Sequence, residues 1–394
     1  MRQLFPPLSA QTVKVLELLP EALARVRPLK RAHKRSLPED VAALSRMLTV
    51  ERRERQRPYW SSPAFVSAYL YYFLPWNLLR QTRLLSSLPL PDPRLNAPQG
   101  EALLLDAGSG PLTLPIALWL ARPEWEEAPV RVLAVDSANQ PLELGMALFS
   151  ALGELLGRKP WPVRAARGPL EHLPRLARQT AARGGRATPP RPWLVAAANV
   201  LNEAGRHFHE GGGMDESLER LAEIFTVISP SALLFIEPGT RLGGKTIMRL
   251  RESARQNGFG AASPCTHNSP CPLLAGDGGK TWCHFTFDTQ GAPSWLTRLS
   301  NEAGLTKNAL SLSPLLLLPQ AQKQAGGAEV RVISAPFSVP GLAGLARYAC
   351  SAGGLLLLED AGRAASGEAL SVRADKNAPR DKKSRARVVH SDSG

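Results

Sequence analysis

The sequence predicts an α/β fold in which a parallel β-sheet carries helices on both of its faces. Between residues 99 and 257, short apolar runs alternate with stretches of helical periodicity, which is the pattern of parallel strands joined by crossover helices. Hydrophobic residues make up 44% of the 394 residues, so the chain can bury a sizeable core and is not a wholly disordered protein. This length favours two or three domains.

The elements of this body are expected in strict alternation. The predicted strands are residues 102–105, 130–135, 193–198 and 231–236, and the predicted helices are residues 112–121, 140–156, 215–227 and 245–257. Residues 178–192, rich in Arg, Gly, Thr and Pro, are predicted to be a loop. Beyond residue 258 the pattern is less regular, and the strand candidates there are residues 281–287, 312–318, 329–334, 345–350 and 354–358.

The region before this body is expected to be helical. Residues 12–26 have the periodicity of an amphipathic helix that is interrupted at Pro20. A further, aromatic helix is predicted over residues 65–73, because the Ser-Pro-Ala sequence at 62–64 places proline in the first helical position. Residues 86–99 are rich in Pro and Ser, which is typical of a linker.

These changes of pattern divide the chain into four predicted parts. They are a basic helical region at 1–98, a Rossmann-like domain at 99–257, a Cys/His-containing region with C-terminal strands at 258–370, and a basic disordered tail at 371–394. We see neither a secretory signal nor an apolar run long enough to cross a bilayer. The sequence therefore predicts a cytoplasmic protein without membrane contact.

The excess positive charge lies at the two ends of the chain. The formal net charge of +14 divides into +9 over residues 1–100, +1 over 101–370 and +4 over 371–394. Basic ends favour a polyanion such as a nucleic acid as partner, and Tyr59 and Trp60 could stack on its bases or pack in the core. The candidate nucleic-acid contacts are Arg31, Lys34, Arg35, Arg52, Arg53, Lys382 and Lys383. The alternative is that these runs are solvated faces without a partner.

A glycine turn after the first predicted strand indicates a nucleoside-cofactor site. The sequence Asp106-Ala107-Gly108-Ser109-Gly110-Pro111 follows that strand, and its glycines allow a sharp turn and a close approach to a ligand. Asp136 closes the next strand, where a carboxylate can accept hydrogen bonds from a ribose diol. The third glycine of the dinucleotide fingerprint is missing near Leu112, which argues against NAD. The alternative is a strand–turn–helix without a ligand.

A second glycine-rich segment is a candidate phosphate loop. Residues Gly239 to Thr246 satisfy G-x-x-x-x-G-K-[ST] and lie between a predicted strand and a predicted helix, as in P-loop NTPases. The match lies late in the α/β body, whereas a P-loop usually follows the first strand, and the sole candidate for the magnesium-binding aspartate is Asp360. The alternative is a turn before a helix in which Lys245 is merely solvated.

The cysteines indicate a metal site. The chain has four of them, too few for a disulfide scaffold: Cys265, Cys271, Cys283 and Cys350. The first three fall within 19 residues, beside His267 and His284, either of which could replace a thiolate or support one. A four-thiolate site suits a structural Zn²⁺ or a [4Fe–4S] cluster. The alternative is four unrelated buried thiols.

These motifs occur together in the order found in a known family. They are Tyr59–Pro75, Leu105–Pro111, Asn199–Glu203, Ile236–Thr240, Pro264–His267, Cys271–Leu273 and Trp282–Phe285. Over roughly residues 58–290 the sequence resembles the methyltransferase-like family associated with the small ribosomal subunit, whose eukaryotic members act in mitochondrial small-subunit assembly. That family is similar in fold to class I S-adenosylmethionine (SAM)-dependent methyltransferases.

The resemblance implies particular ligands and site residues. SAM would be bound by Asp106, Gly108, Gly110, Asp136 and Asn199. A [4Fe–4S] cluster, or alternatively Zn²⁺, would be held by Cys265, Cys271, Cys283 and Cys350. The implied partner is small-subunit rRNA, and the Glu-Pro-Gly-Thr turn at 237–240 is explained without a phosphate loop. The oligomeric state is left open.

No catalytic residue can be named from the sequence. Methyl transfer to a base nitrogen usually needs a polar-Pro-Pro-aromatic loop after the fourth strand, and Asn199-Val200-Leu201-Asn202-Glu203 occupies that place. The aromatic clamp for a flipped base is therefore missing from this loop. Two hypotheses remain, a SAM-dependent rRNA methyltransferase and an rRNA-binding assembly factor without turnover, with a P-loop NTPase as a less favoured third.

Overall fold

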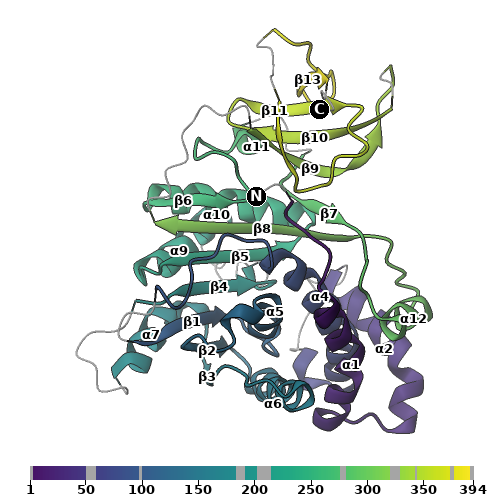
Figure 1. Ribbon diagram of the computed structural model, residues 1–394, viewed down its shortest axis with the longest axis vertical. Helices are drawn as coiled ribbons and strands as arrows, with labels where there is room; N and C mark the ends of the chain where they lie inside the picture. The colour runs from purple at the N-terminus through teal and green to yellow at the C-terminus, as the bar shows by residue number, and fades with distance from the viewer. Residues whose placement is uncertain are drawn as a thin grey trace.

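The structure of the protein is a computed structural model. It describes residues 3–49, 59–96, 100–182, 191–201, 214–275, 281–319, 329–341, 344–372 and 377–390. A central sheet is covered by helices, a smaller sheet lies at one end of the long axis, and the N-terminal helices lie beside the other end (Figure 1).

The central sheet has eight strands and is mostly parallel. In spatial order they are β3 (Val163–Arg167), β2 (Val130–Asp136), β1 (Ala102–Ala107), β4 (Leu194–Ala198), β5 (Ala232–Pro238), β8 (Leu310–Pro319) and β6 (Phe259–Ser263), with β7 (Phe285–Phe287) pairing to β8. Strand β8 is antiparallel to its neighbours. This confirms the predicted α/β body. The chain reverses its direction of strand addition between β1 and β4, which is where open α/β sheets bind ligands.

Helices cover both faces of the sheet because the side chains of its central strands alternate between two cores. Leu104 of β1 belongs to one core, whereas Leu103 and Leu105 belong to the other. The first core includes α4 (Leu74–Leu85), α5 (Thr113–Ala121) and α6 (Asn139–Leu156), and the second includes α7 (Leu173–Ala182), α9 (Met214–Val227) and α10 (Arg241–Gln256).

The N-terminal region is helical, as predicted. Its helices are α1 (Ala10–Val26), α2 (Arg31–Thr49), α3 (Pro63–Ala68) and a π-helical stretch (Tyr69–Phe73) that continues into α4, and α12 (Ser294–Glu302) packs against them. The Ser62 hydroxyl caps α3 by accepting a hydrogen bond from the Phe65 amide, and Pro63 is its first residue. The predicted helix start is confirmed.

Pro20 does not interrupt α1, so that prediction is wrong. A proline at this position has no N–H to donate to the carbonyl of Leu16. The indole Nε1 of Trp295, in α12, donates to that carbonyl instead, at 3.2 Å. Because a side chain distant in sequence satisfies the orphaned acceptor, the helix continues through the proline.

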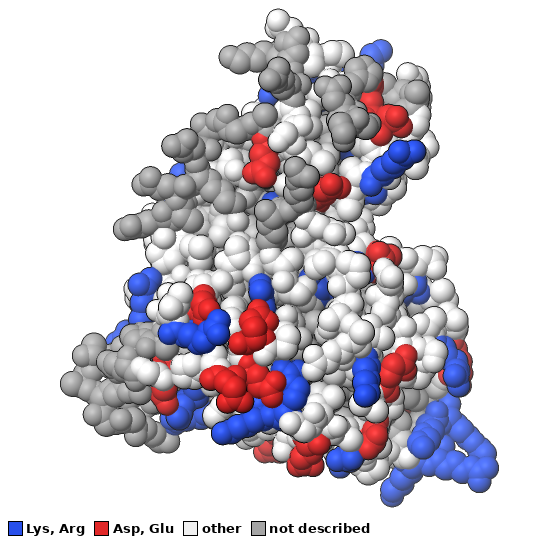
Figure 2. Space-filling view, viewed as in Figure 1, with Lys and Arg blue, Asp and Glu red and all other residues white. Residues whose placement is uncertain are grey.

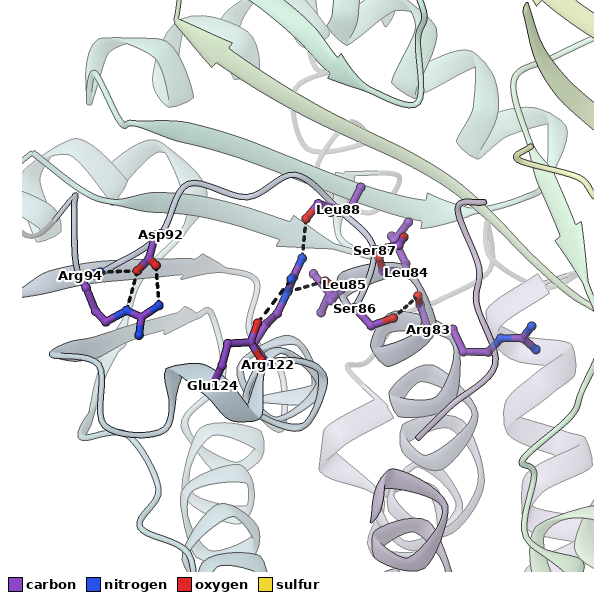
Figure 3. A network of polar contacts seen from close by, with 10 residues as sticks. All are labelled: Arg83, Leu84, Leu85, Ser86, Ser87, Leu88, Asp92, Arg94, Arg122 and Glu124. Carbon is purple, nitrogen blue, oxygen red and sulfur yellow. Dashed lines mark hydrogen bonds and ion pairs between the residues drawn. The ribbon is translucent and has the colours of Figure 1, made fainter. Parts of the chain in front are cut away.

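Residues 86–96, predicted as part of a linker, are held against the central domain. Arg122, at the end of α5, donates hydrogen bonds to the carbonyls that follow α4, including that of Leu88 (Figure 3). The indole of Trp193 donates to the carbonyl of Pro91 at 2.9 Å. These contacts fix α4 relative to β1 and α5.

The smaller sheet has five strands and corrects one prediction. In spatial order they are β12 (Ala369–Ser371), β9 (Glu329–Ser338), β10 (Leu345–Ser351), β11 (Gly354–Glu359) and β13 (Arg387–His390). The predicted disorder of 371–394 is wrong for β13, which pairs in parallel with β11. Val388 and Val389 explain the difference, because both pack against this sheet's apolar clusters despite the charged composition around them.

Further differences between the predicted and the observed elements concern two strands, one helix and the segment before β7. Strands β3 and β6 were not predicted, because β3 carries two arginines and β6 consists mostly of small residues. Helix α7 continues to Ala182, into the predicted loop at 178–192. The predicted strand at 281–287 is a strand over Phe285–Phe287, preceded by the short helix α11 (Pro272–Ala275).

Candidate cofactor site and cysteine cluster

A cavity of about 1070 Å³ lies at the carboxyl ends of β1, β2 and β4. Every residue that the sequence predicted for the cofactor site lines it: Asp106, Gly108, Gly110, Asp136 and Asn199. They come together because these neighbouring parallel strands end at the same edge of the sheet.

The turn after β1 depends on its glycines. Gly108 has φ +68°, and a Cβ atom there would lie 2.3 Å from the Val200 side chain. Gly110 has φ +53° with open space around it. At the place of the missing third glycine, Leu112 adopts φ +56°. Close packing of a helix on this turn is provided by Gly145 of α6 instead, where a Cβ atom would lie 2.5 Å from the backbone of the turn.

Two carboxylates differ in their surroundings within this cavity. Asp136 is half-buried; its Oδ2 accepts a hydrogen bond from the Gly110 amide at 2.9 Å and its Oδ1 one from the Ala138 amide at 3.0 Å. Each oxygen keeps a further lone pair for a ligand hydroxyl. Asp106 is 1% exposed and accepts from the Ser109 hydroxyl. Burial, with Asp136 nearby, raises the pKa of Asp106 to about 7.

The loop after β4 is anchored by a buried carboxylate. Asn199 has φ +59°, and its amide donates to the carbonyl of Ile236 at 2.8 Å. The Leu201 amide donates to Oε1 of Glu237, which is fully buried. Sequence reasoning noted Glu237 as part of a motif without a role for it. The other polar candidates of this loop, residues 202 and 203, lie outside the described residues.

Sequence reasoning missed the wall of the cavity that faces the glycine turn. It is formed by the N-terminal helical region and includes Tyr59, Trp60, Tyr69, Asn77 and Gln81. Tyr69 precedes Asn77 by eight residues, and Asn77 precedes Gln81 by four. The three residues therefore share one face of a continuous helix. That spacing of polar residues in an apolar helix was the available signal.

The four cysteines line a second, small cavity of about 20 Å³. Cys265 and Cys271 lie between β6 and α11, Cys283 precedes β7, and Cys350 is in β10 of the smaller sheet. Arg331 of β9 donates to the carbonyl of Pro264 at 2.8 Å and so ties the smaller sheet to the first of these segments. The cysteines therefore meet where the two sheets join.

The thiols lie in buried surroundings that include the guanidinium groups of Arg251 and Arg331. Burial, followed by the neighbouring Cys265, raises the pKa of Cys271 to about 11, and the pKa values of Cys283 and Cys350 are raised well above 9 for the same reasons. Arg251 lines the cavity and donates to the carbonyls of His267 and Ser269 at 3.0 and 2.7 Å. A guanidinium so placed favours an anionic ligand.

The side chains here are of the kind that a four-thiolate site uses. Four thiols converge on one cavity, with Arg251 as a countercharge. His267 also lines the cavity, whereas His284 stacks on Trp282 beside it. Within the described part of the chain, no group of three or more His, Cys, Asp or Glu side chains is arranged to hold a metal ion.

The geometry of residues 239–246 does not fit a phosphate loop, so that alternative is corrected. Helix α10 begins at Arg241 with Thr240 as its N-cap, which places Lys245 and its neighbours inside a helix rather than in a cradle of backbone N–H groups. The glycines serve packing. A Cβ atom on Gly243 would lie 2.2 Å from a carbonyl oxygen, and one on Gly244 would lie 2.5 Å from Trp282.

None of the predicted nucleic-acid contacts that the structure describes lines either cavity. Arg31, Lys34 and Arg35 are exposed in α2, and Lys and Arg side chains gather over the N-terminal helices in Figure 2. Lys382 and Lys383 are exposed in the turn before β13, at the opposite end of the long axis (Figure 1). Arg52 and Arg53 lie outside the described residues.

The strand order defines a class of protein. A parallel sheet in the order β3-β2-β1-β4-β5, extended by an antiparallel β8 before β6, is the class I Rossmann-like fold of SAM-dependent methyltransferases. Over residues 214–336 the chain matches the family model described as mitochondrial small ribosomal subunit Rsm22. This match runs from α9 into β9 and confirms the resemblance to a small-subunit methyltransferase-like family.

Solved structures similar to this chain include methyltransferases. A TehB-like SAM-dependent methyltransferase from Corynebacterium glutamicum is 14% identical, with a TM-score of 0.27 over 57% of this chain and 82% of that one. A precorrin-6y C5,15-methyltransferase from Geobacter metallireducens is 13% identical, with a TM-score of 0.27 over 59% and 82%. The mitomycin 7-O-methyltransferase MmcR is 14% identical, with a TM-score of 0.33 over 64% and 70%. No curated protein sequence matches this chain.

No helix within the described part of the chain combines the length and the apolar character needed to span a membrane.

Proposed function

We propose that the protein is a SAM-dependent methyltransferase-like protein that acts on or binds small-subunit rRNA and carries a four-cysteine [4Fe–4S] cluster. The observation that carries the SAM assignment is the cavity of about 1070 Å³ at the switch point between β1 and β4, lined by the glycine turn and Asp136. The family match supports the ribosomal assignment.

In this proposal Asp136, the two glycines of the turn and Asn199 have separate physical tasks. SAM, when bound, supplies an electrophilic methyl group on its sulfonium sulfur. Asp136 accepts hydrogen bonds from the ribose hydroxyls, and its bonds to the Gly110 and Ala138 amides hold it in place. Gly108 and Gly110 let the backbone approach the ligand. Asn199 closes the cavity from the end of β4.

A methyl-transfer assay distinguishes an rRNA methyltransferase from an assembly factor that binds rRNA without turnover. Small-subunit particles are incubated with the protein and methyl-labelled SAM, and label in rRNA is measured. Transfer above the level of an Asp136→Ala control supports an rRNA methyltransferase. SAM binding without transfer supports the assembly factor. A protein that binds neither SAM nor small-subunit particles contradicts the proposed function.

The cluster proposal rests on the four thiols that line one buried cavity beside Arg251. The cluster, when bound, supplies iron–thiolate bonds that join the two sheets through Cys265, Cys271, Cys283 and Cys350. Anaerobically purified protein is expected to contain iron and acid-labile sulfide in equal amounts. Stoichiometric zinc without sulfide would replace the cluster by a structural zinc site.

The rRNA proposal rests on the exposed Lys and Arg side chains of α2 and on Lys382 and Lys383 in the turn before β13. The affinity for rRNA is expected to fall steeply with salt, because phosphate binding releases counterions. Neutralising Arg31, Lys34 and Arg35 should flatten that dependence, and so should neutralising Lys382 and Lys383, which leaves β13 in place. An unchanged slope in both variants contradicts these contacts. Substitutions test the tail better than its deletion, because deletion would also remove β13.

A further inference from the structure

The cofactor cavity has a second wall that the proposed function does not use. Its volume of about 1070 Å³ exceeds the roughly 300–1,000 Å³ of a typical small-molecule pocket. The strand ends and the glycine turn form one side. The other side comes from the N-terminal helical region. Arg122 joins this region to the central domain by hydrogen bonds (Figure 3), and so does Trp193.

The outer part of this wall is aromatic. The ring centroids of Trp60 and Tyr69 lie 4.8 Å apart, and those of Tyr59 and Trp60 also lie 4.8 Å apart. All three rings line the cavity and are half-buried, so each buries part of its surface in the core and presents part to the cavity. Aromatic surfaces of this kind stack on unpaired bases regardless of base identity.

The inner part of the same wall is polar and incompletely hydrogen-bonded. Gln81 is 1% exposed, and its Oε1 has no hydrogen-bond partner among the described residues. The hydroxyl of Thr113, which is 6% exposed and lies in the neighbouring helix α5, lines the same cavity and also has no hydrogen-bond partner among the described residues. A buried acceptor without a donor costs about 1–3 kcal/mol. Gln81 Oε1 therefore indicates a ligand that brings a donor, and the Thr113 hydroxyl can either donate to that ligand or accept from it.

Asn77 lies between the two parts on the same helix face. Its Oδ1 accepts a hydrogen bond from Arg80, so its Nδ2 is left to donate. Helix α4 thus offers an amide donor at Asn77 and an amide acceptor at Gln81, one turn apart. A nucleobase edge with an amino group next to a ring nitrogen or carbonyl complements this pair.

We infer that Tyr59, Trp60 and Tyr69, together with Asn77 and Gln81, form a subsite for a single unpaired nucleobase of RNA next to the SAM site. This inference rests on the proposed function and names the part of the substrate that the cavity receives. The aromatic clamp missing from the loop after β4 is then supplied by the N-terminal region, from the opposite side of the cavity. The base enters with its face against the rings and its amino group toward Gln81 Oε1.

The test uses the full-length protein and two separate titrations. The first measures the affinity for S-adenosylhomocysteine. The second measures, at saturating S-adenosylhomocysteine, the affinity for a labelled single-stranded RNA pentanucleotide. Trp60→Ala and Tyr69→Ala should weaken pentanucleotide binding by roughly 5- to 140-fold, the range for losing one base-stacking side chain. Trp60→Phe and Tyr69→Phe keep a ring and should stay within about threefold of the wild type.

Gln81→Met tests the polar part, because it keeps the size of the side chain and removes the acceptor. It should weaken pentanucleotide binding by roughly tenfold. All variants should keep their affinity for S-adenosylhomocysteine within twofold, which also shows that they are folded. Pentanucleotide affinity unchanged in the alanine variants overturns the inference. Parallel loss of S-adenosylhomocysteine affinity also overturns it, because the wall would then belong to the cofactor.

Failure of the proposed function can be distinguished from failure of the base subsite. If the wild-type protein does not bind S-adenosylhomocysteine, the SAM assignment fails. The pentanucleotide titration of the same variants without that ligand still decides whether the wall binds a base.

Discussion

The two cavities of this protein differ in size and in the chemical groups that line them. The cofactor cavity measures about 1070 Å³ and is lined by carboxylates, amides and glycine backbone at the ends of parallel strands. The cysteine cavity measures about 20 Å³, roughly the space of one water molecule, and is lined by four thiols, apolar side chains, His267 and Arg251. The first can admit and release a ligand, whereas the second joins two sheets. We therefore expect the loss of a ligand-binding carboxylate at the first to lower SAM affinity, and the loss of a cysteine at the second to have the largest effect on stability.

The largest effect is expected at the cysteine cavity. Cys350→Ser should abolish iron binding and lower the free energy of unfolding by more than about 4 kcal/mol, because a lost metal site also loses its link between the two sheets. Iron content and thermal unfolding measure this. Ser351→Ala, the next residue of β10, is the matched control and should keep its iron. Full iron content in Cys350→Ser would remove Cys350 from the ligand set.

The next effect concerns the buried carboxyl of Asp106. Its pKa of about 7 in the folded protein lies above the ordinary 3.8, so the folded state binds the proton more tightly than the unfolded state. Its contribution to stability is therefore complete below about pH 4 and is lost as the pH rises to about 7, by at most about 4 kcal/mol. Asp106→Asn should remove this part of the pH dependence, as measured by denaturant unfolding from pH 4 to 8. An identical pH profile in the variant would argue against a raised pKa.

A smaller effect is expected for SAM affinity. Asp136→Ala removes the acceptor of two ribose hydroxyls and should cost about 3 kcal/mol, or roughly 100-fold in Kd measured by calorimetry. Iron content should be unchanged, which separates the two cavities. Glu171 also lines the cofactor cavity but is exposed, and Glu171→Gln is the control with unchanged affinity. Equal losses in both variants would indicate a nonspecific charge effect.

The smallest effect is the difference in stability between alanine variants at two glycines of one turn, Gly108 and Gly110. Both have positive φ, so alanine at either position should cost about 1–2 kcal/mol. Gly108→Ala should cost a further ~1–3 kcal/mol, because its Cβ would meet Val200, whereas a Cβ at Gly110 meets nothing within 4 Å. Denaturant unfolding of the two variants compares them. Equal destabilisation would mean that the loop after β4 moves away without cost.

The sequence predicted best what depends on short segments. The glycine turn and Asp136 belong to one strand–turn–helix and the strand that follows it, so their positions in a parallel sheet were inferable from local pattern. The cysteines were grouped by their chemistry, and the structure does bring them to one cavity. That three of them approach Cys350 depends on the docking of the two sheets, which the spacing does not encode.

What the sequence did not predict depends on contacts between distant segments. The α1 helix continues through Pro20 because Trp295 reaches its orphaned carbonyl. Tyr69, Asn77 and Gln81 become a cavity wall because Arg122 and neighbouring contacts hold α4 against the central domain. The G-x-x-x-x-G-K-T match was misleading for the same reason. Its last glycine is required for packing against Trp282, at a distance that no local pattern reveals.

The central claim is that SAM binds at the carboxyl ends of β1 and β2 and not near the cysteines. Hydrogen–deuterium exchange of the full-length protein with and without SAM tests it most directly. The account predicts slower amide exchange on SAM addition in residues 106–114 and 136–140, with unchanged exchange in residues 263–275 and 281–285. Protection confined to the cysteine segments, or no protection anywhere, would contradict it.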